Sequence, residues 1–510
     1  MSSAKHQKNF WRFGLLAVAI LYFAVRLLHL TDSCLVFDEI FSVHAATHSW
    51  ATLFQFVAAD LIHPPLFYVL LKIWILAGGE SLVWLRIFPV VFAVSAICPF
   101  LLLCLELKLK ESETLLAFIF LATNGALVRY SQEVRMYSLL FCFSVVSLWL
   151  LVKFLDNKST RTVYLWLLFF NFLLIYTHYF GWLTIGGETL AVLILRREKM
   201  RQFFGLVGIL ILGFMPWVWI IWSVSPTANE LAQNIGWQSK PGLVKLTQFL
   251  LTLNEPFYYQ QSSVDPISVW LISVPLALIC LGAIIWVAFK QRDEKVILLL
   301  ILVGAPLVIA FAASWLLPSS IWGVRHLIVI FAPFALLASI AINRLAFREL
   351  KFAVYALIGI LILTAGLTHF TTQPQTFIWC GWEILSAQAD AQTTAPTTVY
   401  VFEDDGAYQL WYWLKNNPKF KIVSIKGYDD LFEDKSFFLP RSFDDVQIAD
   451  KTAIAGDRFY LAFRETSWKP DKQVLQDLTK RGYKIGAPSQ FTAQGFTAFL
   501  VPVDKVTRQN

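Results

Sequence analysis

Charged residues are scarce in this sequence, which limits the polar surface that the chain can present to water. Of its 510 residues, 15% are Asp, Glu, Lys or Arg, whereas 57% are hydrophobic. A water-soluble protein could not cover so much apolar side-chain surface, so most of the chain is expected to lie in a lipid bilayer. The 20 Trp and 16 Tyr suit two water–lipid interfaces, where amphipathic rings settle. The composition therefore predicts a polytopic, mostly α-helical membrane protein.

Several chemical signatures are missing as well. The six cysteines show no CxxC spacing, and no GxSxG, HExxH or phosphate-loop pattern occurs. Serine-nucleophile hydrolysis, zincin chemistry and ATP use therefore have no support in the sequence. Four cysteines lie in apolar runs, as small core residues do: Cys98, Cys104, Cys142 and Cys280. Cys34 and Cys380 would share one face of the membrane, and sequence alone leaves open whether they pair.

Long apolar runs divide the first 370 residues into about eleven predicted transmembrane helices. They lie near residues 13–31, 86–107, 114–130, 136–155, 163–178, 180–195, 203–222, 268–289, 296–317, 325–343 and 352–370. The first run is long for a signal peptide and has no small-residue cleavage site after it, so we expect an uncleaved helix. The segment 64–79 is ambiguous, because Pro64-Pro65 opens it, Lys72 interrupts it and Gly78-Gly79 closes it.

The basic residues indicate which side each loop faces. If 64–79 lies at the interface and the N-terminus is cytoplasmic, every inside loop is basic, as the positive-inside rule requires. These loops lie near residues 1–12, 108–110, 153–161, 196–201, 290–295 and 344–351. This alternation explains the net charge of +7 without a nucleic-acid partner. The first loop, 32–85, the loop near 223–267 and everything after about residue 371 are then expected outside the inner (plasma) membrane.

The composition changes after about residue 371, where Asp, Glu, Lys and Gly become common and long apolar runs stop. Four runs rich in Val, Ile, Phe and Tyr predict strands: Thr397–Phe402, Lys419–Ile425, Arg458–Phe463 and Phe496–Val501. Ala407–Lys415 and Asp471–Lys480 predict helices, the second with Asp471 as its N-cap. We therefore expect a transmembrane domain over 1–370 and a small extracytoplasmic α/β domain over 371–510.

Two adjacent carboxylates, Asp38 and Glu39, stand in the first predicted outer loop. On one interpretation Asp38 merely caps a short helix that starts at Glu39, and both acids face water. On the other, a carboxylate partly desolvated at the membrane rim acts as a base toward an acceptor hydroxyl. Carboxylate oxygens also suit a hard divalent cation, so Asp38, Glu39 and the nearby His63 are candidate metal ligands.

His63-Pro64-Pro65-Leu66 follows in the same loop. The pattern is typical of a helix start with proline at the first helical position. It would also place His63 near a phosphate or metal at a helix N-terminus, where the dipole favours anions.

Polar side chains cluster at other outer helix ends too. Arg129 and Arg135 flank Gln132-Glu133, and arginine can grip a phosphate through two parallel hydrogen bonds. Arg325-His326 and His178-Tyr179 would add donors, although interface packing explains His178 and Tyr179 equally well. All these clusters fall on the predicted outer face, which is the main inference that the sequence supports.

Asp38-Glu39, His63-Pro64-Pro65-Leu66 and the stretch from Tyr130 to Tyr137 together resemble the lipid-sugar-dependent GT-C glycosyltransferases. The similar group is that of the protein O-mannosyltransferases and aminoarabinose transferases. The resemblance covers about residues 10–370 in architecture, with specific motifs only in the first 180 or so. It implies a GT-C fold of about eleven transmembrane helices plus interfacial helices.

The resemblance also implies an inverting enzyme with a polyprenyl-monophosphate sugar as donor and a glycan, lipid or protein as acceptor. Asp38 would match the base, Glu39 would support it or bind acceptor, and Arg135 would match the phosphate-binding arginine. Further phosphate contacts would be Arg129, Arg325, His326 and His63, with Tyr137, His178 and Tyr179 lining the substrate pocket. A divalent metal is the one cofactor considered. A lipid-linked sugar transporter or flippase and another membrane glycan ligase are the alternatives, although a transporter would be expected to carry ionisable residues near the bilayer midplane.

Overall fold

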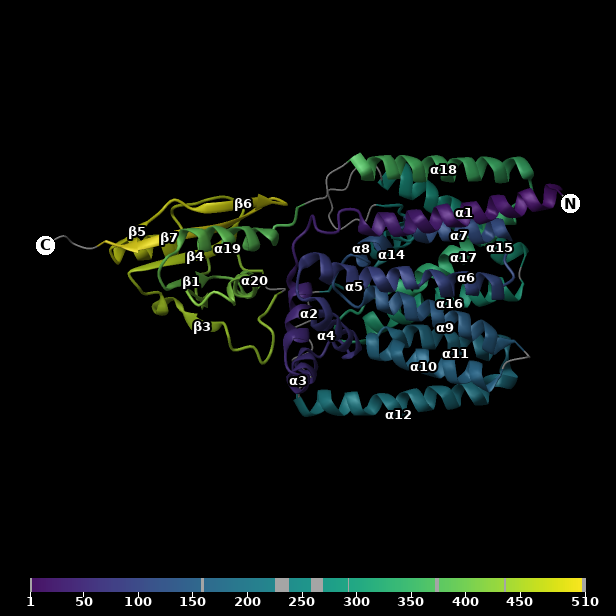
Figure 1. Cartoon of the computed structure of the whole chain (residues 1–510), viewed down its shortest axis with the longest axis horizontal. Helices are drawn as coiled ribbons and strands as arrows, with labels where there is room; N and C mark the ends of the chain where they lie inside the picture. Colours follow the sequence, from purple (N-terminus) through teal and green to yellow (C-terminus); the bar gives the residue numbers. More distant parts are fainter. Residues whose placement is uncertain are drawn as a thin grey trace. The chain divides into compact units, whose positions relative to one another are not determined.

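The computed structural model describes residues 2–156, 160–224, 238–257, 269–291, 293–371, 376–434 and 437–506 (Figure 1). The chain forms two compact units. The helical unit comprises Met1–Leu30 and Leu61–Gln373, and the sheet unit comprises Thr31–Asp60 and Pro374–Asn510. The first predicted outer loop is thus shared between the two. The domain boundary predicted at residue 371 adjoins residues 372–375, which lie outside the described residues, as does much of the predicted outer loop near 223–267.

The helical unit consists of helices that run side by side (Figure 1). They are α1 (Ser2–Leu27), α4 (Leu66–Gly78), α5 (Leu82–Ser95), α6 (Ile97–Glu106), α7 (Glu111–Thr123), α8 (Gly125–Tyr130), α9 (Tyr137–Leu155), α10 (Arg161–Thr177), α11 (Gly181–Leu195), α12 (Met200–Val224), α14 (Leu243–Thr252), α15 (Val274–Lys290), α16 (Glu294–Leu316), α17 (Phe331–Asn343) and α18 (Arg348–Thr371). Short turns precede α12, α15 and α17: η1 (Arg197–Lys199), η2 (Val269–Ser273) and η3 (Ile328–Ile330). Helix α7 packs against α1 and α17, α9 against α10, and α11 against α16.

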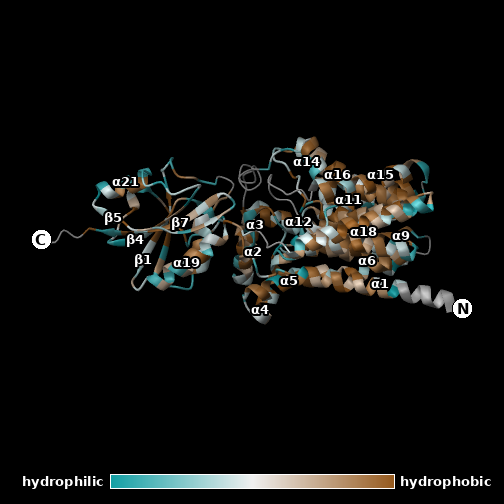
Figure 2. Ribbon diagram, turned by 90° about the horizontal axis from the view of Figure 1, so that it is seen from above, coloured by the Kyte–Doolittle hydropathy of each residue, from teal (hydrophilic) through white to brown (hydrophobic). Residues whose placement is uncertain are grey.

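Each predicted apolar run coincides largely with helix, and hydrophobic residues predominate in the helices of this unit (Figure 2). Within the described residues, six helical stretches are long and apolar enough to cross a membrane. They are Leu82–Glu106, Tyr137–Leu155, Arg197–Val224, Trp270–Lys290, Glu294–Leu316 and Arg348–Thr371. The mostly α-helical, polytopic class is therefore confirmed, while the number of about eleven spans stays a prediction.

Helix α4 is the segment whose sequence was ambiguous. Its 13 residues span only about 20 Å, short of the roughly 30 Å hydrocarbon core. Gly79 ends it with φ of +83°, a conformation that favours glycine, while its N–H donates to the Ile75 carbonyl. The helix begins at Leu66 with Pro65 as its N-cap, so the prediction of a proline at the first helical position, directly after His63, is wrong by two residues. The length agrees with an interfacial helix, which remains a prediction.

Two fully buried charged residues of the helical unit, Glu188 and Arg26, have hydrogen-bond partners on neighbouring helices. Glu188 on α11 is fully buried, and its carboxyl group meets the Ser147 hydroxyl at 2.5 Å and the Asn171 amide at 2.8 Å. These contacts join α9, α10 and α11. Arg26 at the end of α1 is also fully buried and donates to the carbonyls of Leu121 and Ala122 on α7. Polar side chains thus cross-link the helices where apolar packing alone gives no fixed register.

In the residues that the structure describes, the sheet unit is a mixed sheet of seven strands with helices beside it. Its strands are β1 (Thr397–Val401), β2 (Phe420–Lys426), β3 (Gln447–Asp450), β4 (Arg458–Glu465), β5 (Tyr483–Ile485), β6 (Ser489–Ala493) and β7 (Phe496–Lys505). Their order is β3-β2-β1-β4-β7-β5, and β6 also pairs with β7. Neighbours from β3 to β4 are parallel, whereas β7 pairs antiparallel with β4, β5 and β6. The predicted small α/β fold is confirmed.

The helices of the sheet unit come from both ends of the chain. They are α2 (Phe37–Thr47), α3 (Trp50–Asp60), α19 (Cys380–Gln392), α20 (Asp404–Leu414) and α21 (Gln473–Lys480), with the turn η4 (Lys451–Ala453). The N-cap of α21 is Lys472 rather than the predicted Asp471, and Asp430 accepts the Gln473 N–H at 2.7 Å instead. A carboxylate distant in sequence therefore stabilises this helix start.

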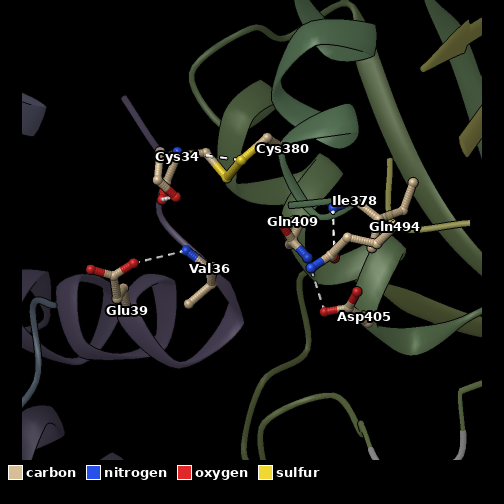
Figure 3. Close-up of a disulfide and its surroundings, with 9 residues drawn as sticks. Cys34, Val36, Glu39, Ile378, Cys380, Asp405, Gln409 and Gln494 are labelled. Carbon is tan, nitrogen blue, oxygen red and sulfur yellow. Dashed lines mark hydrogen bonds between the residues drawn. A yellow bond between two sulfur atoms is a disulfide. The ribbon is translucent and has the colours of Figure 1, made fainter. Parts of the chain in front are cut away.

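Cys34 and Cys380, whose pairing the sequence leaves open, form a disulfide with a Cα–Cα distance of 5.3 Å (Figure 3). Cys34 lies just before α2 and Cys380 is the first residue of α19. The bond therefore ties the start of the first loop to the C-terminal part of the same unit.

Candidate functional site

Asp38 lies in the first turn of α2, which begins at Phe37 with Val36 as N-cap. The alternative that Asp38 caps a helix starting at Glu39 is therefore wrong. A carboxylate in a first turn interacts favourably with the helix dipole. The Asp38 side chain is half-buried. It is thus a carboxylate with access to water and held by a helix.

Glu39 has a different environment. It is 1% exposed, and its Oε2 accepts the Val36 N–H at 3.0 Å (Figure 3). This contact satisfies a backbone donor at the helix start. Of the two predicted carboxylates, Glu39 has a local structural partner and Asp38 is the more accessible to a substrate.

In the helical unit, His63 and Arg135 lie together. His63 stands in the turn before α4 and is 5% exposed, and Arg135 stands between α8 and α9 and is 4% exposed. Arg135 Nη2 lies 3.3 Å from His63 Nε2. Because a guanidinium only donates, His63 accepts through Nε2. The pair places a buried positive charge at the junction of these turns.

Two further histidines extend this group. The His178 ring, at the end of α10, lies 5.1 Å from that of His63 and 5.9 Å from that of His326. Phe180 stacks on His326 at 4.1 Å. Arg325 also acts electrostatically on His178, together with Arg135 and the other two imidazoles. We call His63, Arg135, His178, Arg325 and His326 the arginine–histidine cluster.

The cluster has the chemistry of an anion site. The groups that act electrostatically on His178 include two guanidinium groups and two imidazoles. Arginine and imidazole N–H groups are the donors that hold phosphate oxygens. His326 Nδ1 lies 2.9 Å from the Ile321 carbonyl oxygen. This contact fixes the ring orientation and turns Nε2, the other ring nitrogen, away from that carbonyl. The arrangement can therefore hold a phosphate or a similar anion.

The other predicted residues have separate surroundings. Arg129 pairs with Glu133 at 2.8 Å, so a phosphate would compete with that ion pair. The Tyr137 ring lies 6.3 Å from that of His178, beside the cluster. Tyr179 accepts a hydrogen bond from Trp217 of α12 at 3.2 Å, as expected for helix packing. The structure thus brings together five of the predicted residues and Tyr137, and gives Arg129 and Tyr179 other contacts.

The fold was compared with those of solved structures. It matches the crystal structure of ArnT from Cupriavidus metallidurans bound to undecaprenyl phosphate, with a TM-score of 0.62 and 12% sequence identity over 98% of this chain and 99% of that one. The apo structure of the same ArnT matches with a TM-score of 0.62 and 12% identity, over 97% and 98%. The chain has the ArnT-like GT-C fold. No protein-family model and no curated protein matches its sequence.

The GT-C fold agrees with the resemblance seen in the sequence motifs, and the whole chain takes part, sheet unit included. An identity of 12% establishes the fold and leaves the activity to be argued from the site.

A divalent metal was the one cofactor predicted for this fold. Among the described residues, no group of three or more His, Cys, Asp and Glu side chains is arranged to hold a metal ion. Glu39, one of the three candidate ligands, already accepts a backbone N–H. The divalent metal therefore stays a prediction, and we assign it no step.

Sequence reasoning missed a buried polar pair that includes a residue of α2, the helix that carries Asp38. His44 on α2 and Tyr408 on α20 form a buried hydrogen bond of 2.9 Å between His44 Nδ1 and the Tyr408 hydroxyl. They are 364 positions apart in the sequence, and neither stands in a recognisable motif. Only the fold brings them together.

Proposed function

We propose that this protein is a membrane glycosyltransferase. It transfers a sugar from a polyprenyl-monophosphate donor to an acceptor hydroxyl, with inversion at the anomeric carbon. The observation that carries the proposal is the arginine–histidine cluster in a GT-C fold. The similar ArnT structure was solved with undecaprenyl phosphate, a ligand that pairs an anion with a polyprenyl chain, as the proposed donor does.

Asp38 is the proposed base. Its carboxylate takes the proton from the acceptor hydroxyl as the acceptor oxygen bonds to the anomeric carbon. The bond from that carbon to the phosphate oxygen breaks, and its electron pair stays on the phosphate. A single displacement of this kind inverts the configuration. The products are the glycosylated acceptor and the polyprenyl monophosphate.

The phosphate gains a negative charge when it leaves. Arg135 and Arg325 stabilise that charge, and His63 and His326 add hydrogen-bond donors as their protonation allows. Arg135 is the principal contact because its guanidinium is charged and the residue is only 4% exposed, so water screens the charge little. Buried donors of fixed orientation stabilise the developing charge better than solvent does.

The proposed orientation follows from charge and redox chemistry. Basic loops on one side put the N-terminus in the cytoplasm, and the loops that bear the cluster on the opposite side. The Cys34–Cys380 disulfide belongs in an oxidising compartment, which supports an extracytoplasmic sheet unit. The protein would thus act at the outer face of the inner (plasma) membrane.

A purified-protein assay tests the function. The protein in detergent is incubated with synthetic polyprenyl-phosphate hexoses and pentoses and with an extract of cell-envelope acceptors. Mass spectrometry should detect polyprenyl monophosphate released together with a glycosylated product. A flippase or other carrier would leave the sugar–phosphate bond intact. A ligase would transfer sugar only from a pyrophosphate-linked donor, which serves as the comparison.

The acceptor is best identified in cells. Mass spectrometry of glycolipids, glycans and glycoproteins from cells lacking the protein should show one class without a hexose or pentose. That loss names both the donor sugar and the acceptor. Unchanged glycosylation of all three classes would count against the transferase.

A further inference from the structure

The helices α2 and α3, residues 37–60, form a hairpin that belongs to the sheet unit, although the rest of that unit starts more than 300 residues later. Asp38 lies on the first turn of this hairpin. Contacts between the hairpin and the C-terminal part of the unit occur at both of its ends, and they determine where Asp38 is held.

The first contact is covalent. The Cys34–Cys380 disulfide joins the residues just before α2 to the start of α19 (Figure 3). Both cysteines are buried, with 6% exposure each. The backbone that leads into the Asp38 turn is therefore tied to the C-terminal part of the chain.

The second contact is aromatic and adjoins Asp38 in sequence. The Phe37 ring lies 5.1 Å from the Tyr408 ring and 5.2 Å from the Phe437 ring. Phe437 in turn lies 5.2 Å from Trp379, beside the disulfide. Aromatic ring pairs of this kind stabilise the folded state through their geometry, in addition to the burial of apolar surface. The first turn of α2 thus rests on α20 and on the segment around Phe437.

The third contact holds the last turn of α2. His44 Nδ1 and the Tyr408 hydroxyl lie 2.9 Å apart, and the His44 ring packs against Trp411 at 4.7 Å and Phe443 at 5.4 Å. Burial lowers the pKa of His44 to about 3, and His48 and Lys415 act in the same direction. His44 is therefore neutral at physiological pH. A neutral imidazole suits this position, because burying a charge among aromatic rings would be costly.

The end of α3 is held as well. Arg441 Nη1 donates to the Ala59 carbonyl at 3.1 Å, which satisfies an acceptor in the last turn of that helix. The hairpin is thus fixed before α2, along α2 and at the end of α3, each time by residues beyond 370.

We propose that the C-terminal part of the sheet unit positions Asp38, with Tyr408 and the Cys34–Cys380 disulfide as positioning residues. This inference rests on the proposed role of Asp38 as the base. A base acts only from a narrow range of geometries, so loosening the hairpin lowers the rate of the chemical step. When the hairpin is loosened, the affinity for the donor stays unchanged, because that affinity depends on the phosphate contacts. The C-terminal part thereby becomes a component of the catalytic apparatus.

Tyr408→Phe tests the proposal with the loss of one hydroxyl. The matched control is Tyr400→Phe, because the Tyr400 hydroxyl bonds to the Ala453 and Ala455 carbonyls within the same unit and not to the hairpin. Backbone hydrogen exchange of residues 37–47 should accelerate about tenfold in Tyr408→Phe and remain unchanged in Tyr400→Phe. In the transfer assay, kcat should fall about tenfold with KM for the donor unchanged.

Reduction of the disulfide gives a second, reversible test. Cys34→Ser/Cys380→Ser, or the reduced wild type, should show the same faster exchange and lower kcat, and reoxidation of the wild type should restore both. Equal rates of backbone hydrogen exchange over residues 37–47 in Tyr408→Phe, the double-serine variant and wild type would overturn the positioning role. A wild type that releases no polyprenyl phosphate would instead contradict the proposed transferase, while the exchange data would still report whether the C-terminal part holds α2.

Discussion

His63 Nε2 lies 3.3 Å from Arg135 Nη2, although 72 positions separate the two residues. One stands in the turn before α4 and the other in the turn between α8 and α9. His178 and His326 approach the same place from two further turns. Four turns of the helical unit thus converge on one cationic and imidazole-rich cluster.

Arg135→Ala should weaken binding of a polyprenyl-phosphate sugar by about 10- to 100-fold, the loss expected for a charge-assisted hydrogen bond at a buried site. Arg135→Lys keeps the charge but loses the planar fork, so we expect an intermediate affinity. Fluorescence titration or calorimetry in detergent measures the affinity. Arg129→Ala is the matched control, because Arg129 already pairs with Glu133, and its effect should be smaller. Equal affinity of Arg135→Ala and wild type would remove the proposed phosphate contact.

The proposed orientation can be tested by cysteine labelling. Lys469→Cys, at an exposed position of the sheet unit, should react with a membrane-impermeant maleimide added to intact cells or spheroplasts. Lys110→Cys, in a predicted cytoplasmic loop, should react only after permeabilisation. Both variants should carry Cys98→Ser, since Cys98 is an exposed free thiol. The reverse pattern would invert the topology.

The stability of the sheet unit should depend on pH through two buried acids. Burial raises the pKa of Glu403 to about 7 from an ordinary 4.5, despite the opposing effect of Arg464. Burial and the neighbouring Glu403 raise the pKa of Asp405 well above its usual range. Between pH 4.5 and 7 the folded state therefore holds more protons than the unfolded one, so the free energy of unfolding falls as pH rises.

Asp405→Asn removes one of these groups while it keeps the shape of the side chain. We expect the variant to be more stable than wild type at pH 8, by roughly 1–3 kcal/mol, and less dependent on pH. Hydrogen exchange of the β1 and α20 peptides across this pH range measures the effect. Asp404→Asn is the control, because Asp404 pairs with Lys426 at 3.1 Å and should lose stability at pH 8. A wild-type unit more stable at pH 8 than at pH 5 would contradict the account.

The helices that lie in long apolar runs were predictable because the thickness of the bilayer sets the length of such runs, whereas α3, α14 and α19 were not predicted. The four strands rich in Val, Ile, Phe and Tyr appear where expected. The strands β3, β5 and β6 were missed, since they are short and carry polar residues such as Gln447, Lys484 and Gln490. For the candidate site, counting basic loops predicts that the polar turns share one face of the membrane. The resemblance predicts that His63 and Arg135 hold the same phosphate, and the two side chains do meet. The contact of His63 with His178 depends on tertiary packing and has no local signal in the sequence.

The contacts of the first loop were the least predictable feature. The Cys34–Cys380 bond and the His44–Tyr408 hydrogen bond each join segments more than 300 residues apart. Neither residue pair has a local pattern that marks its partner, and cysteine spacing alone does not give connectivity.

Asp38 is the proposed base in sugar transfer. The most direct measurement compares Asp38→Asn with wild type in the purified transfer assay, with donor affinity measured on the same samples. Asparagine keeps the size of the side chain but cannot take up the acceptor proton, so product formation should fall by at least about 100-fold. Donor affinity and folding should stay close to those of wild type. Product formed by Asp38→Asn at the wild-type rate would contradict the account.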